Sequence, residues 1–412
     1  MVKAGARRKG FDCDVDRLLE LDRQRRDLTY EIENMRAKRN AGSKQIPKLK
    51  GEEKAKALAD MKELSTTLKK REPELRAVEE EVNELLLTVP QPPAEGVPDG
   101  ESEEDNVEVQ RWGEPPEFDF QPRDHVELGE MLDIIDIPRG VKLAGQRCYV
   151  LKNEGARLEI AVLNFAFDYM LRQGFTPLIV PVLVREDMMV GTGYFPIGRD
   201  QTYAVPEDER YLVGTAEVSL TAYYADEILN ESDLPVKLVA WSSCFRREAG
   251  TYGKDTRGLY RIHQFQKVEQ VILCRNDEEE SRHWHERILG NAEAIVQALE
   301  LPYRIVAVCT GDLGVGQVRK NDIECWMPSR GGYGETHSCS TLYEFQSRRL
   351  KIRYRDSDGN TRLVHTLNNT VLASPRILIT LLECNQQADG SVVIPEVLRP
   401  YMGGQELIEP KQ

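Results

Sequence analysis

The N-terminal part of the chain carries apolar residues at heptad spacing, which predicts two amphipathic helices between residues 15 and 88. The first run has the seam rows Leu21, Leu28, Met35 and Leu18, Ile32. The second run has the rows Met61, Leu68, Leu75, Val82 and Leu64, Val78, Leu85. Arg25 interrupts the first seam and Arg71 the second. Each helix is therefore expected to bury one stripe against a partner helix.

A short break between these runs predicts that the chain reverses. Gly42, Pro47 and Gly51 lie there, so the helices should pair as an antiparallel hairpin. At 1.5 Å per residue, about 30 residues of helix project roughly 45 Å. Pro73 predicts a kink in the second helix. Residues 89–106 are rich in proline, glycine and acidic residues and are predicted to be a linker, which places a boundary near residue 100.

Beyond about residue 115 the pattern changes to short β-branched runs that alternate with helical segments. Residues 158–174 predict a helix ended by Gly174, and an apolar helix is predicted to end the segment 365–384. The remaining segments are expected to be extended: 175–184, 236–248, 260–274 and 348–355, the last followed by a turn at 356–360 and a hairpin partner. We therefore predict an α+β fold with an antiparallel sheet at 101–412, after a helical arm and linker at 1–100.

The charge of the chain is unevenly distributed. The 412 residues carry a net charge of −14, which by itself argues against a nucleic-acid partner. The segment from Arg36 to Lys56 is an exception, with eight basic residues against Glu52 and Glu53. It lies at the expected tip of the hairpin, where a merely solvated helix face is the common alternative to a binding surface. The basic residues are Arg36, Lys38, Arg39, Lys44, Lys48, Lys50, Lys54 and Lys56.

Several classes of protein and site are disfavoured. The chain has no stretch of about 18 apolar residues and no secretory signal pattern, so a cytoplasmic protein without a membrane span is expected. Eight cysteines without a C-x-x-C pair argue against a disulfide framework or a zinc site. GDLGVG (311–316) lacks the Lys and Ser of a phosphate-binding loop and predicts a turn. His283 and His285 have no third ligand and are predicted to lie on an exposed helix.

The block FRREAGTYGKDTRGLYRIHQFQKVEQ predicts two strands joined by a polar, glycine-rich loop. Arg246 and Glu248 are expected on one strand, and His263, Phe265 and Glu269 on its partner. Arg246 could hold a phosphate or carboxylate, Phe265 could stack on a base, and Glu269 could receive an ammonium group. From these residues alone, a salt-bridged hairpin remains the alternative.

Five ordered motifs together show a specific resemblance. GFTPLIVP with Pro181 resembles motif 1 of class II aminoacyl-tRNA synthetases, the FRREAG to QFQKVEQ block resembles motif 2, and LASPRILITLLE with Arg376 resembles motif 3. GTAEVSL (214–220) and ETHSCS (335–340) lie between them. With the helical hairpin and the ending QQADGSVVIPEVLRPYM, the chain closely resembles bacterial seryl-tRNA synthetases along essentially its whole length.

This resemblance implies a role for each matching residue. Arg246, Glu269 and Arg376 are the implied catalytic residues. The implied serine-binding residues are Thr215, Ala216, Glu217, Arg246, Glu269 and Thr370. The implied ATP-binding residues are Arg246, Arg247, Glu248, Arg261, Ile262, Phe265, Glu335, Thr336, His337, Ser338 and Arg376. Glu335 and Ser338 would also hold Mg²⁺, which prefers oxygen ligands, and Cys339 is expected to be a bystander.

The implied reaction is activation of serine by ATP to seryl-adenylate and pyrophosphate, followed by transfer to the terminal adenosine of tRNA(Ser). Use of tRNA(Sec) is left open. Arg36, Lys38, Arg39, Lys44, Lys48 and Lys50 are the implied tRNA-binding residues. Motif 1 implies a homodimer, and the loop from Ala249 to Tyr260 is expected to move, with freedom at Gly250, Gly253 and Gly258.

Two departures and three alternatives accompany this interpretation. The resemblance implies a further helix before the arm, although only about fourteen residues precede the first heptad. LNNT replaces the LNGS of many relatives, so Thr370 must supply the hydroxyl. The alternatives are a ligase that passes activated serine to a carrier protein, a non-catalytic tRNA-binding paralogue, and a class II synthetase for threonine or proline. The basic tip disfavours the carrier-protein ligase. The presence of Arg246, Glu335 and Arg376 disfavours the non-catalytic paralogue. The lack of a zinc ligand set disfavours a threonine enzyme.

Overall fold

The structure is a computed structural model that describes residues 1–250, 255 and 257–411. The chain divides into two compact units. The first contains residues 1–7 and 11–90, and the second contains residues 8–10 and 91–412.

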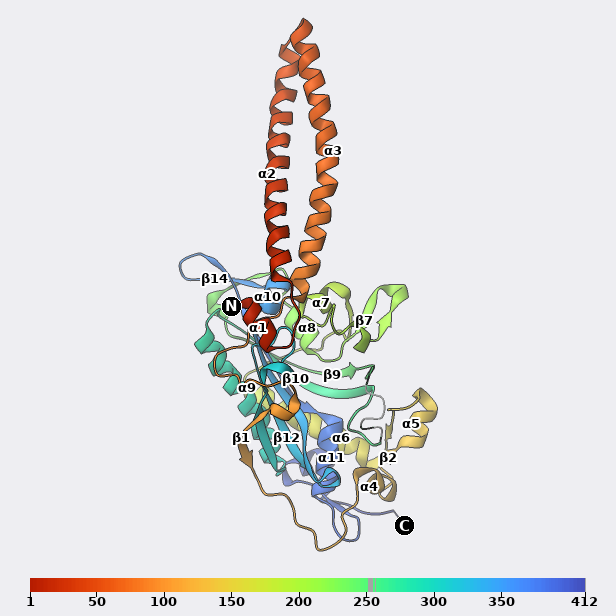
Figure 1. The fold of residues 1–412 in the computed structure, drawn as a ribbon. Helices are drawn as coiled ribbons and strands as arrows, with labels where there is room; N and C mark the ends of the chain where they lie inside the picture. Colours follow the sequence, from red (N-terminus) through yellow and green to blue (C-terminus); the bar gives the residue numbers. More distant parts are fainter. Residues whose placement is uncertain (251–254, 256, 412) are drawn as a thin grey trace. The chain divides into compact units, whose positions relative to one another are not determined.

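The first unit is a helical hairpin made by α2 (Val15–Gln45) and α3 (Gly51–Thr88), which lie side by side in Figure 1. Asp14 caps α2 by accepting a hydrogen bond from the Arg17 amide. The turn contains the 3₁₀ helix η1 (Ile46–Lys48), and a short helix α1 (Val2–Arg8) precedes the hairpin. The predicted hairpin is confirmed, and the segment before it does hold a helix.

One local prediction for this hairpin was wrong, and the predicted kink at Pro73 stays a prediction. Gly42 belongs to α2 rather than to the turn. It faces α3, since a Cβ at this position would lie 2.7 Å from the Met61 sulfur, so glycine permits the close approach. Pro73 lies inside the single helix α3, which continues to Thr88.

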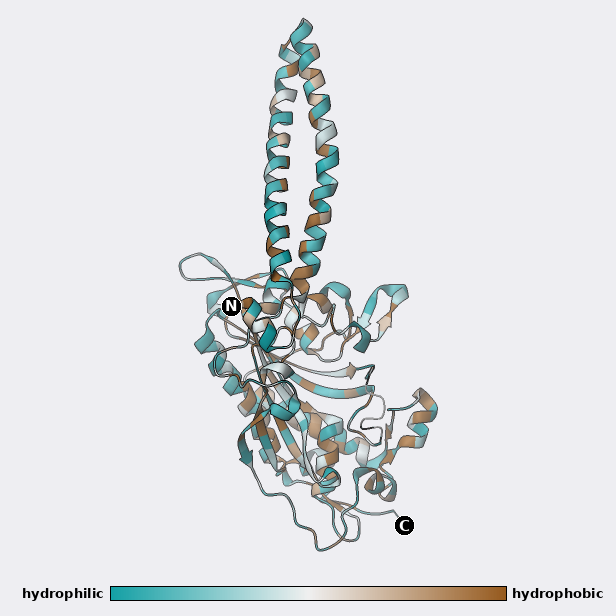
Figure 2. Ribbon diagram, in the orientation of Figure 1, coloured by the Kyte–Doolittle hydropathy of each residue, from teal (hydrophilic) through white to brown (hydrophobic). Residues whose placement is uncertain are grey.

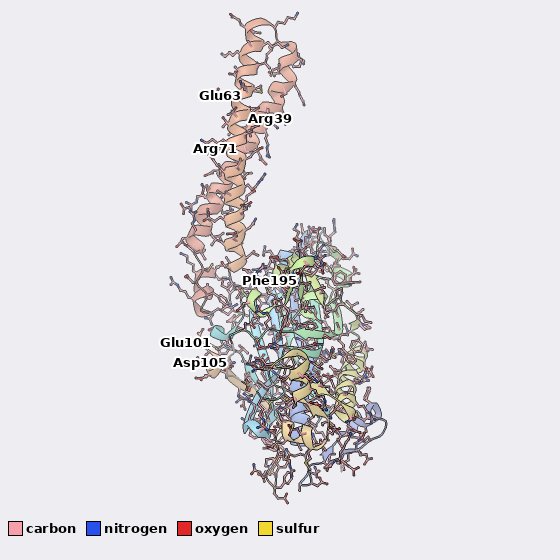
Figure 3. All side chains as sticks on the ribbon, turned by 90° about the vertical axis from the view of Figure 1, so that its right-hand side faces the viewer. Arg39, Glu63, Arg71, Glu101, Asp105 and Phe195 are labelled. Carbon is pink, nitrogen blue, oxygen red and sulfur yellow. The ribbon has the colours of Figure 1, made fainter. Side chains whose placement is uncertain are left out.

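The apolar seam holds the two helices together. Its buried members all come from the predicted rows: Leu21, Leu28, Ile32, Leu68, Val78 and Val82. Figure 2 shows that most of the remaining surface of both helices is hydrophilic. Ion pairs cross between the helices, including Arg71 with Glu31 at 3.5 Å, so the residue that interrupts the second seam still contacts the partner helix. Arg71, Arg39 and Glu63 mark this stretch of the hairpin in Figure 3.

The second unit is built on an eight-stranded sheet in the order β1-β11-β12-β13-β16-β10-β9-β4. Every neighbouring pair is antiparallel except β4 with β9. This sheet contains the longest strands of the unit. Its strands are β1 (Val107–Trp112), β4 (Thr176–Pro177), β9 (Val236–Phe245), β10 (Gln264–Cys274), β11 (Tyr303–Ala307), β12 (Arg319–Met327), β13 (Gly332–Tyr343) and β16 (His365–Ala373).

Three helices pack on this sheet and enclose the main core: α6 (Asn153–Arg172), α9 (Glu278–Ala298) and α11 (Ser374–Cys384). Their apolar faces contribute Leu163, Ile295 and Leu381 to a core that also takes Val268 and Leu367 from the central strands. The predicted α+β class with an antiparallel sheet is confirmed. Burial of these side chains at about 25 cal/mol per Å² of apolar surface is the main stabilising contribution.

Smaller elements surround the sheet. The short helices are α4 (His125–Met131), α5 (Ile137–Ala144), α7 (Glu186–Gly191), α8 (Glu217–Ala222) and α10 (Phe345–Leu350). The short strands are β2 (Ile135–Asp136), β3 (Val150–Leu151), β5 (Leu183–Arg185), β6 (Ala204–Val205), β7 (Arg210–Leu212), β8 (Ile228–Asn230), β14 (Arg353–Arg355), β15 (Thr361–Leu363), β17 (Val392–Val393) and β18 (Leu407–Ile408). The hairpin partner of β14 is confirmed as β15. The predicted strand 348–355 was wrong at its start, where α10 continues to Leu350.

The structure also shows the histidines of α9, the segment 311–316 and the cysteines. His283 is exposed on α9, but His285 is buried and bonds Thr341 and Asn321, so the predicted exposed position was wrong for His285. Its apolar surroundings lower the pKa of His285 to about 4. The segment 311–316 forms turns, as predicted. All eight cysteines are free. Among the described residues, no helix combines the length and apolar character that a membrane crossing needs.

Candidate active site

The strands β9 and β10 form the base of the candidate site. Phe265, Lys267 and Glu269 alternate along β10, so their side chains share one face of the sheet. β9 ends at Phe245, and the Arg246 amide then donates to the His263 carbonyl at 2.9 Å, which continues the pairing. Arg246 and Glu248 were predicted on the strand itself. They lie just beyond its end, where Glu248 takes the left-handed conformation at φ 51°.

A cleft opens over this face and gathers most of the predicted ATP-binding residues. Its lining residues are Arg246, Glu248, Leu259, Tyr260, Arg261, Ile262, Phe265, Lys267, Glu335, Thr336, Thr370, Ala373, Pro375 and Arg376. They come from β10, β13, β16, α11 and the loop between β9 and β10. Segments that are far apart in the sequence therefore meet at one cleft.

Arg246 and Phe265 lie together in the cleft. The Arg246 guanidinium carbon lies 5.2 Å from the centroid of the Phe265 ring. A cation beside an exposed aromatic face suits a planar, negatively charged nucleotide. Glu248 is held in place by Arg261, whose Nη1 donates to Glu248 Oε2 at 3.0 Å.

Arg376 lies at the start of α11 and contacts β13. Its Nη1 donates to the Glu335 carbonyl oxygen at 2.7 Å and lies 3.3 Å from Glu335 Oε2. The positive charges of Arg376, Lys320 and Arg246 outweigh the loss of solvent in the cleft and lower the pKa of Glu335 below its usual range. Glu335 is therefore an anion throughout the physiological pH range.

A bulge in β13 brings two oxygen ligands to the same face. Ile323 pairs with His337 and Glu324 with Glu335, so Thr336 is an extra residue in the register. Since Asp322 pairs with Ser338, Glu335 and Ser338 lie opposite residues two apart on β12 and share a face. A carboxylate and a hydroxyl on one face are suitable ligands for Mg²⁺. His337 falls on the other face, is fully buried, and bonds Thr336.

Four of the predicted serine-binding residues form a buried cluster that adjoins the cleft: Thr215, Glu217, Glu269 and Thr370. Thr215 donates to Glu269 Oε2 at 3.2 Å and accepts a hydrogen bond from the Glu217 amide. Lys267 pairs with Glu269, and its Nζ lies 3.4 Å from Thr370 Oγ1. The cluster holds two carboxylates and one ammonium group among these residues. An added substrate ammonium would neutralise the excess negative charge.

Glu217 is oriented by two side chains that the sequence analysis missed. Tyr194 Oη donates to Glu217 Oε2 at 2.8 Å, and Gln346 Nε2 donates to Oε1 at 2.8 Å. Burial raises the pKa of Glu217, and the nearby Glu269 raises it further. No local motif marks Tyr194 or Gln346, because the contact depends on the packing of α7, α8 and α10.

Not every predicted residue reaches the cleft. Arg247 points away and its Nη1 donates to the Asp200 carbonyl at 3.1 Å. Ala216 is fully buried in a core cluster, where it can offer only its backbone. Lys267 was missed although it lies two residues from both Phe265 and Glu269, so the strand alternation could have identified it.

The loop from Ala249 to Tyr260 is described only in part. Gly250 and Gly258 have φ values of +78° and +80°, a conformation that favours glycine. Gly253 lies outside the described residues. Asp255 pairs with Arg330 at 2.8 Å, which ties the second half of this loop to the sheet unit.

At the hairpin tip, the six predicted tRNA-binding residues are all exposed. Arg36 pairs with Glu72 of the other helix at 2.7 Å. Across the described part of the chain, none of the other five takes part in an ion pair within 4.0 Å: Lys38, Arg39, Lys44, Lys48 and Lys50. Their charges therefore remain available to a phosphate backbone.

Comparison with known families matches both parts of the chain. Residues 1–93 match the "Seryl-tRNA synthetase N-terminal domain", and residues 202–385 match the "tRNA synthetase class II core domain (G, H, P, S and T)". The serine–tRNA ligase of Deinococcus radiodurans is 48% identical over 407 residues, covering 99% of this chain and 96% of the relative. That of Thermobifida fusca is 46% identical over 410 residues, with the same coverage.

Solved structures agree with the sequence comparison. Seryl-tRNA synthetase from Pyrococcus horikoshii, complexed with ATP, is 39% identical with a TM-score of 0.91, covering 100% of this chain and 97% of that one. Cytoplasmic serine–tRNA ligase from Naegleria fowleri, complexed with AMP, is 29% identical with a TM-score of 0.86, covering 100% and 95%. The chain therefore belongs to the seryl-tRNA synthetase family of class II aminoacyl-tRNA synthetases.

Proposed function

We propose that this chain activates L-serine with ATP and transfers it to the 3′-terminal adenosine of tRNA(Ser). The observation that carries the proposal is the single cleft in which Arg246, Phe265, Glu335 and Arg376 adjoin the buried Thr215–Glu217–Glu269 cluster. A nucleotide and an amino acid bound at these adjacent positions would have their reacting groups close together. Positioning of two reactants in this way is a large source of rate enhancement.

In the first step, the serine carboxylate attacks the α-phosphorus of ATP and pyrophosphate leaves. Arg246 holds the α-phosphate and the carboxylate, while Arg376 holds the γ-phosphate. Phe265 stacks on the adenine ring, and Glu248 accepts from its amino group. Residues Arg261 and Ile262, which line the same cleft, assist with the phosphates and the ring.

In the second step, the terminal hydroxyl of the tRNA attacks the carbonyl carbon of seryl-adenylate and AMP leaves. No protein nucleophile is needed, because the mixed anhydride is already activated. Cys339 is fully buried and does not line the cleft, so it takes no part in the proposed mechanism.

Mg²⁺ is part of the proposed reaction. Glu335 and Ser338 fit it, because β13 presents an ionised carboxylate and a hydroxyl on one face. When bound there, the ion would neutralise charge on the phosphates.

Serine selection is assigned to the buried cluster. Glu217 and Glu269 receive the ammonium group, and Thr370 supplies a partner for the substrate hydroxyl. Alanine would leave this partner without its hydrogen bond, and a buried polar group that is left unpaired costs binding energy. Threonine would add a methyl group beside side chains that are all buried.

A homodimer is also proposed. Helix α6 and the motif 1 segment after it expose apolar side chains at Ile160, Leu171 and Ile179, of which Ile179 is fully exposed. Exposed apolar groups of this kind are typical of protein interfaces. Sedimentation equilibrium should give twice the chain mass of 47.0 kDa, and Ile179→Asp should shift the protein toward the monomer.

The partner of the hairpin tip is proposed to be tRNA(Ser), with tRNA(Sec) as a second candidate substrate. The exposed lysines and arginines of the tip suit recognition of backbone shape. Serine charging is supported over transfer to a carrier protein, because the curated serine–tRNA ligases align over 99% of the chain. A cytoplasmic location completes the proposal, and the eight free cysteines are compatible with a reducing compartment.

The proposal is tested by pyrophosphate exchange with serine, threonine, alanine and glycine, with and without Mg²⁺. We expect exchange with serine and Mg²⁺ only, together with transfer of labelled serine to total tRNA. Exchange without transfer would favour a carrier ligase. Absence of exchange would favour a non-catalytic tRNA-binding protein.

A further inference from the structure

A buried histidine outside the cleft is bonded to the loop that enters it. His125 begins helix α4 and is 7% exposed. Its Nε2 lies 3.1 Å from the backbone nitrogen of Leu259, which donates a hydrogen bond to it. A backbone N–H can only donate, so Nε2 must be unprotonated and the ring proton lies on Nδ1.

The Nδ1 proton is directed at a buried carboxylate. Nδ1 lies 2.7 Å from Glu383 Oε1, which also accepts the His125 amide at 3.0 Å. Glu383 belongs to α11 and is fully buried. Its Oε2 accepts the Ser329 amide at 2.9 Å. Three N–H donors therefore satisfy this carboxylate, and His125 is fixed in both tautomer and orientation.

Of the residues next to these anchor points, Tyr260 contacts the catalytic arginine Arg376, and Arg330 contacts Tyr260. Tyr260 follows Leu259, and its carbonyl accepts from Arg376 Nε at 3.2 Å. The guanidinium carbons of Arg376 and Arg330 lie 4.4 and 4.2 Å from the centroid of the Tyr260 ring. Arg330 follows Ser329. The Leu259 and Ser329 amides, which are held through His125 and Glu383, are thus each followed by a residue of this stack: Tyr260, which contacts Arg376, and Arg330, which contacts Tyr260.

The fit around His125 is tight enough to require a particular loop residue. A Cβ at Gly258 would lie 2.0 Å from His125 Nε2, and Gly258 has a positive φ of +80°. The next residue toward the loop, Arg257, pairs with Asp124 at 2.9 Å, but its side chain is 65% exposed. The hydrogen bond from the Leu259 amide to His125 is therefore the buried contact that holds this end of the loop, whereas the Arg257 ion pair is exposed.

We propose that His125 and Glu383 are positioning residues. They hold the C-terminal end of the loop between β9 and β10 and so fix the position of Tyr260 against Arg376. Neither side chain lines the cleft. Their effect on the reaction passes through Leu259 and Tyr260 to the arginine assigned to the γ-phosphate, which makes ATP the affected substrate. This inference rests on the proposed function, since it takes the cleft to be the ATP site.

Two substitutions separate the two hydrogen bonds of the His125 ring, the one from Leu259 and the one to Glu383. In His125→Gln, the amide oxygen can reach the position of Nε2 and accept from Leu259, but the donor to Glu383 is lost. In His125→Asn, the amide nitrogen can donate to Glu383, but Leu259 is left without its acceptor. His283→Asn, at an exposed histidine of α9, is the matched control.

The primary measurement is the Kd for ATP by isothermal titration calorimetry in MgCl₂, which needs no turnover. We expect His125→Asn to weaken ATP binding by about tenfold and His125→Gln by no more than about threefold, since one buried donor is left unpaired only in the first. In pyrophosphate exchange, KM for ATP should rise while KM for serine stays within about twofold. His283→Asn should behave as wild type.

Equal weakening by the two variants, an unchanged ATP affinity in His125→Asn, or parallel rises in both KM values would overturn the proposal. If His125→Asn does not fold, Gly258→Ala replaces it, because the added methyl group displaces the loop from His125 while leaving the buried pair intact. Unchanged ATP affinity in that variant would also overturn the proposal. Failure of the wild type to exchange pyrophosphate with serine would count against the proposed function instead.

Discussion

The helical hairpin and the sheet unit are stabilised in different ways. The hairpin depends on one narrow apolar seam, and its buried residues come from two sequence segments joined by a short turn. The sheet unit has a broad core to which residues between Leu128 and Ile408 contribute. Its cleft likewise needs side chains from five separate elements. A local repeat is enough to build a helical hairpin, whereas a catalytic site requires contacts between distant segments.

The two regions also differ in how they present charge. Among the residues that the structure describes, the cations of the hairpin tip have no carboxylate partner in salt-bridge range, Arg36 excepted. In the cleft, Arg376 is paired with Glu335, and Lys267 with Glu269. Solvated cations suit attraction of a polyanion over a distance, and fixed pairs suit stabilisation of charge at one place. This contrast supports the separate roles proposed for the two regions in tRNA binding and in chemistry.

The largest expected effect comes from a single residue of the cleft. Arg246→Ala should reduce serine-dependent pyrophosphate exchange by about 10³-fold, because it removes the donor assigned to both the carboxylate and the α-phosphate. Binding of tRNA, measured by filter retention, should stay within about threefold. Arg247→Ala is the control, since Arg247 points to Asp200, and it should change exchange by less than about threefold. Similar losses for the two variants would contradict the assignment.

Neutralising the tip should have the next largest effect, and on tRNA alone. Replacing Lys38, Arg39, Lys44, Lys48 and Lys50 by glutamine is expected to weaken tRNA binding by about 10²-fold at 0.15 M salt. The slope of log K against log[salt] should become shallower by about 3. Exchange should not change. An unaltered salt slope would show that the tip makes no phosphate contacts.

A smaller effect is expected within the serine pocket. Thr215→Val removes the hydroxyl that bonds Glu269 and the Glu217 amide. We expect KM for serine to rise about tenfold and KM for ATP to stay within about twofold, because one buried polar partner is lost. Steady-state exchange kinetics measure both. A rise in KM for ATP alone would place Thr215 outside the serine site.

The smallest effect concerns the ion pair across the hairpin. The Arg36 and Glu72 side chains are 51% and 40% exposed. Arg36→Ala should therefore lower the free energy of unfolding by no more than about 0.5 kcal/mol, as measured by urea denaturation. Leu28→Ala, in the seam, provides the comparison and should cost at least about 2 kcal/mol. Equal losses would mean that ion pairs rather than the seam hold the helices together.

The hairpin could be predicted most directly from the sequence, because heptad spacing is a local property. Leu21, Leu28, Val78 and Val82 were all placed correctly in the seam. The predicted place of Gly42 in the turn was wrong, because glycine is needed at this position for the close approach of Met61 from the other helix. Contacts between helices of this kind leave no signature in the neighbouring residues.

In the sheet unit, local alternation identified β9 and β10 but not β12 or β13, and the site depended on resemblance to a known family. Strand alternation could also have found Lys267. It could not have found Tyr194, Gln346 or His125, whose partners are from 23 to 258 residues away. The shared face of Glu335 and Ser338 depends on a bulge that the alternation rule does not anticipate.

The most direct test of the division between arm and cleft compares both half-reactions in one shortened protein. Residues 36–56 are replaced by a short glycine-serine turn, and serine-dependent pyrophosphate exchange and serine transfer to tRNA are measured with the same preparation. We predict exchange within about twofold of the full chain and transfer reduced by at least about 10²-fold at low tRNA concentration. Transfer that keeps pace with exchange would contradict the assignment of tRNA binding to the tip.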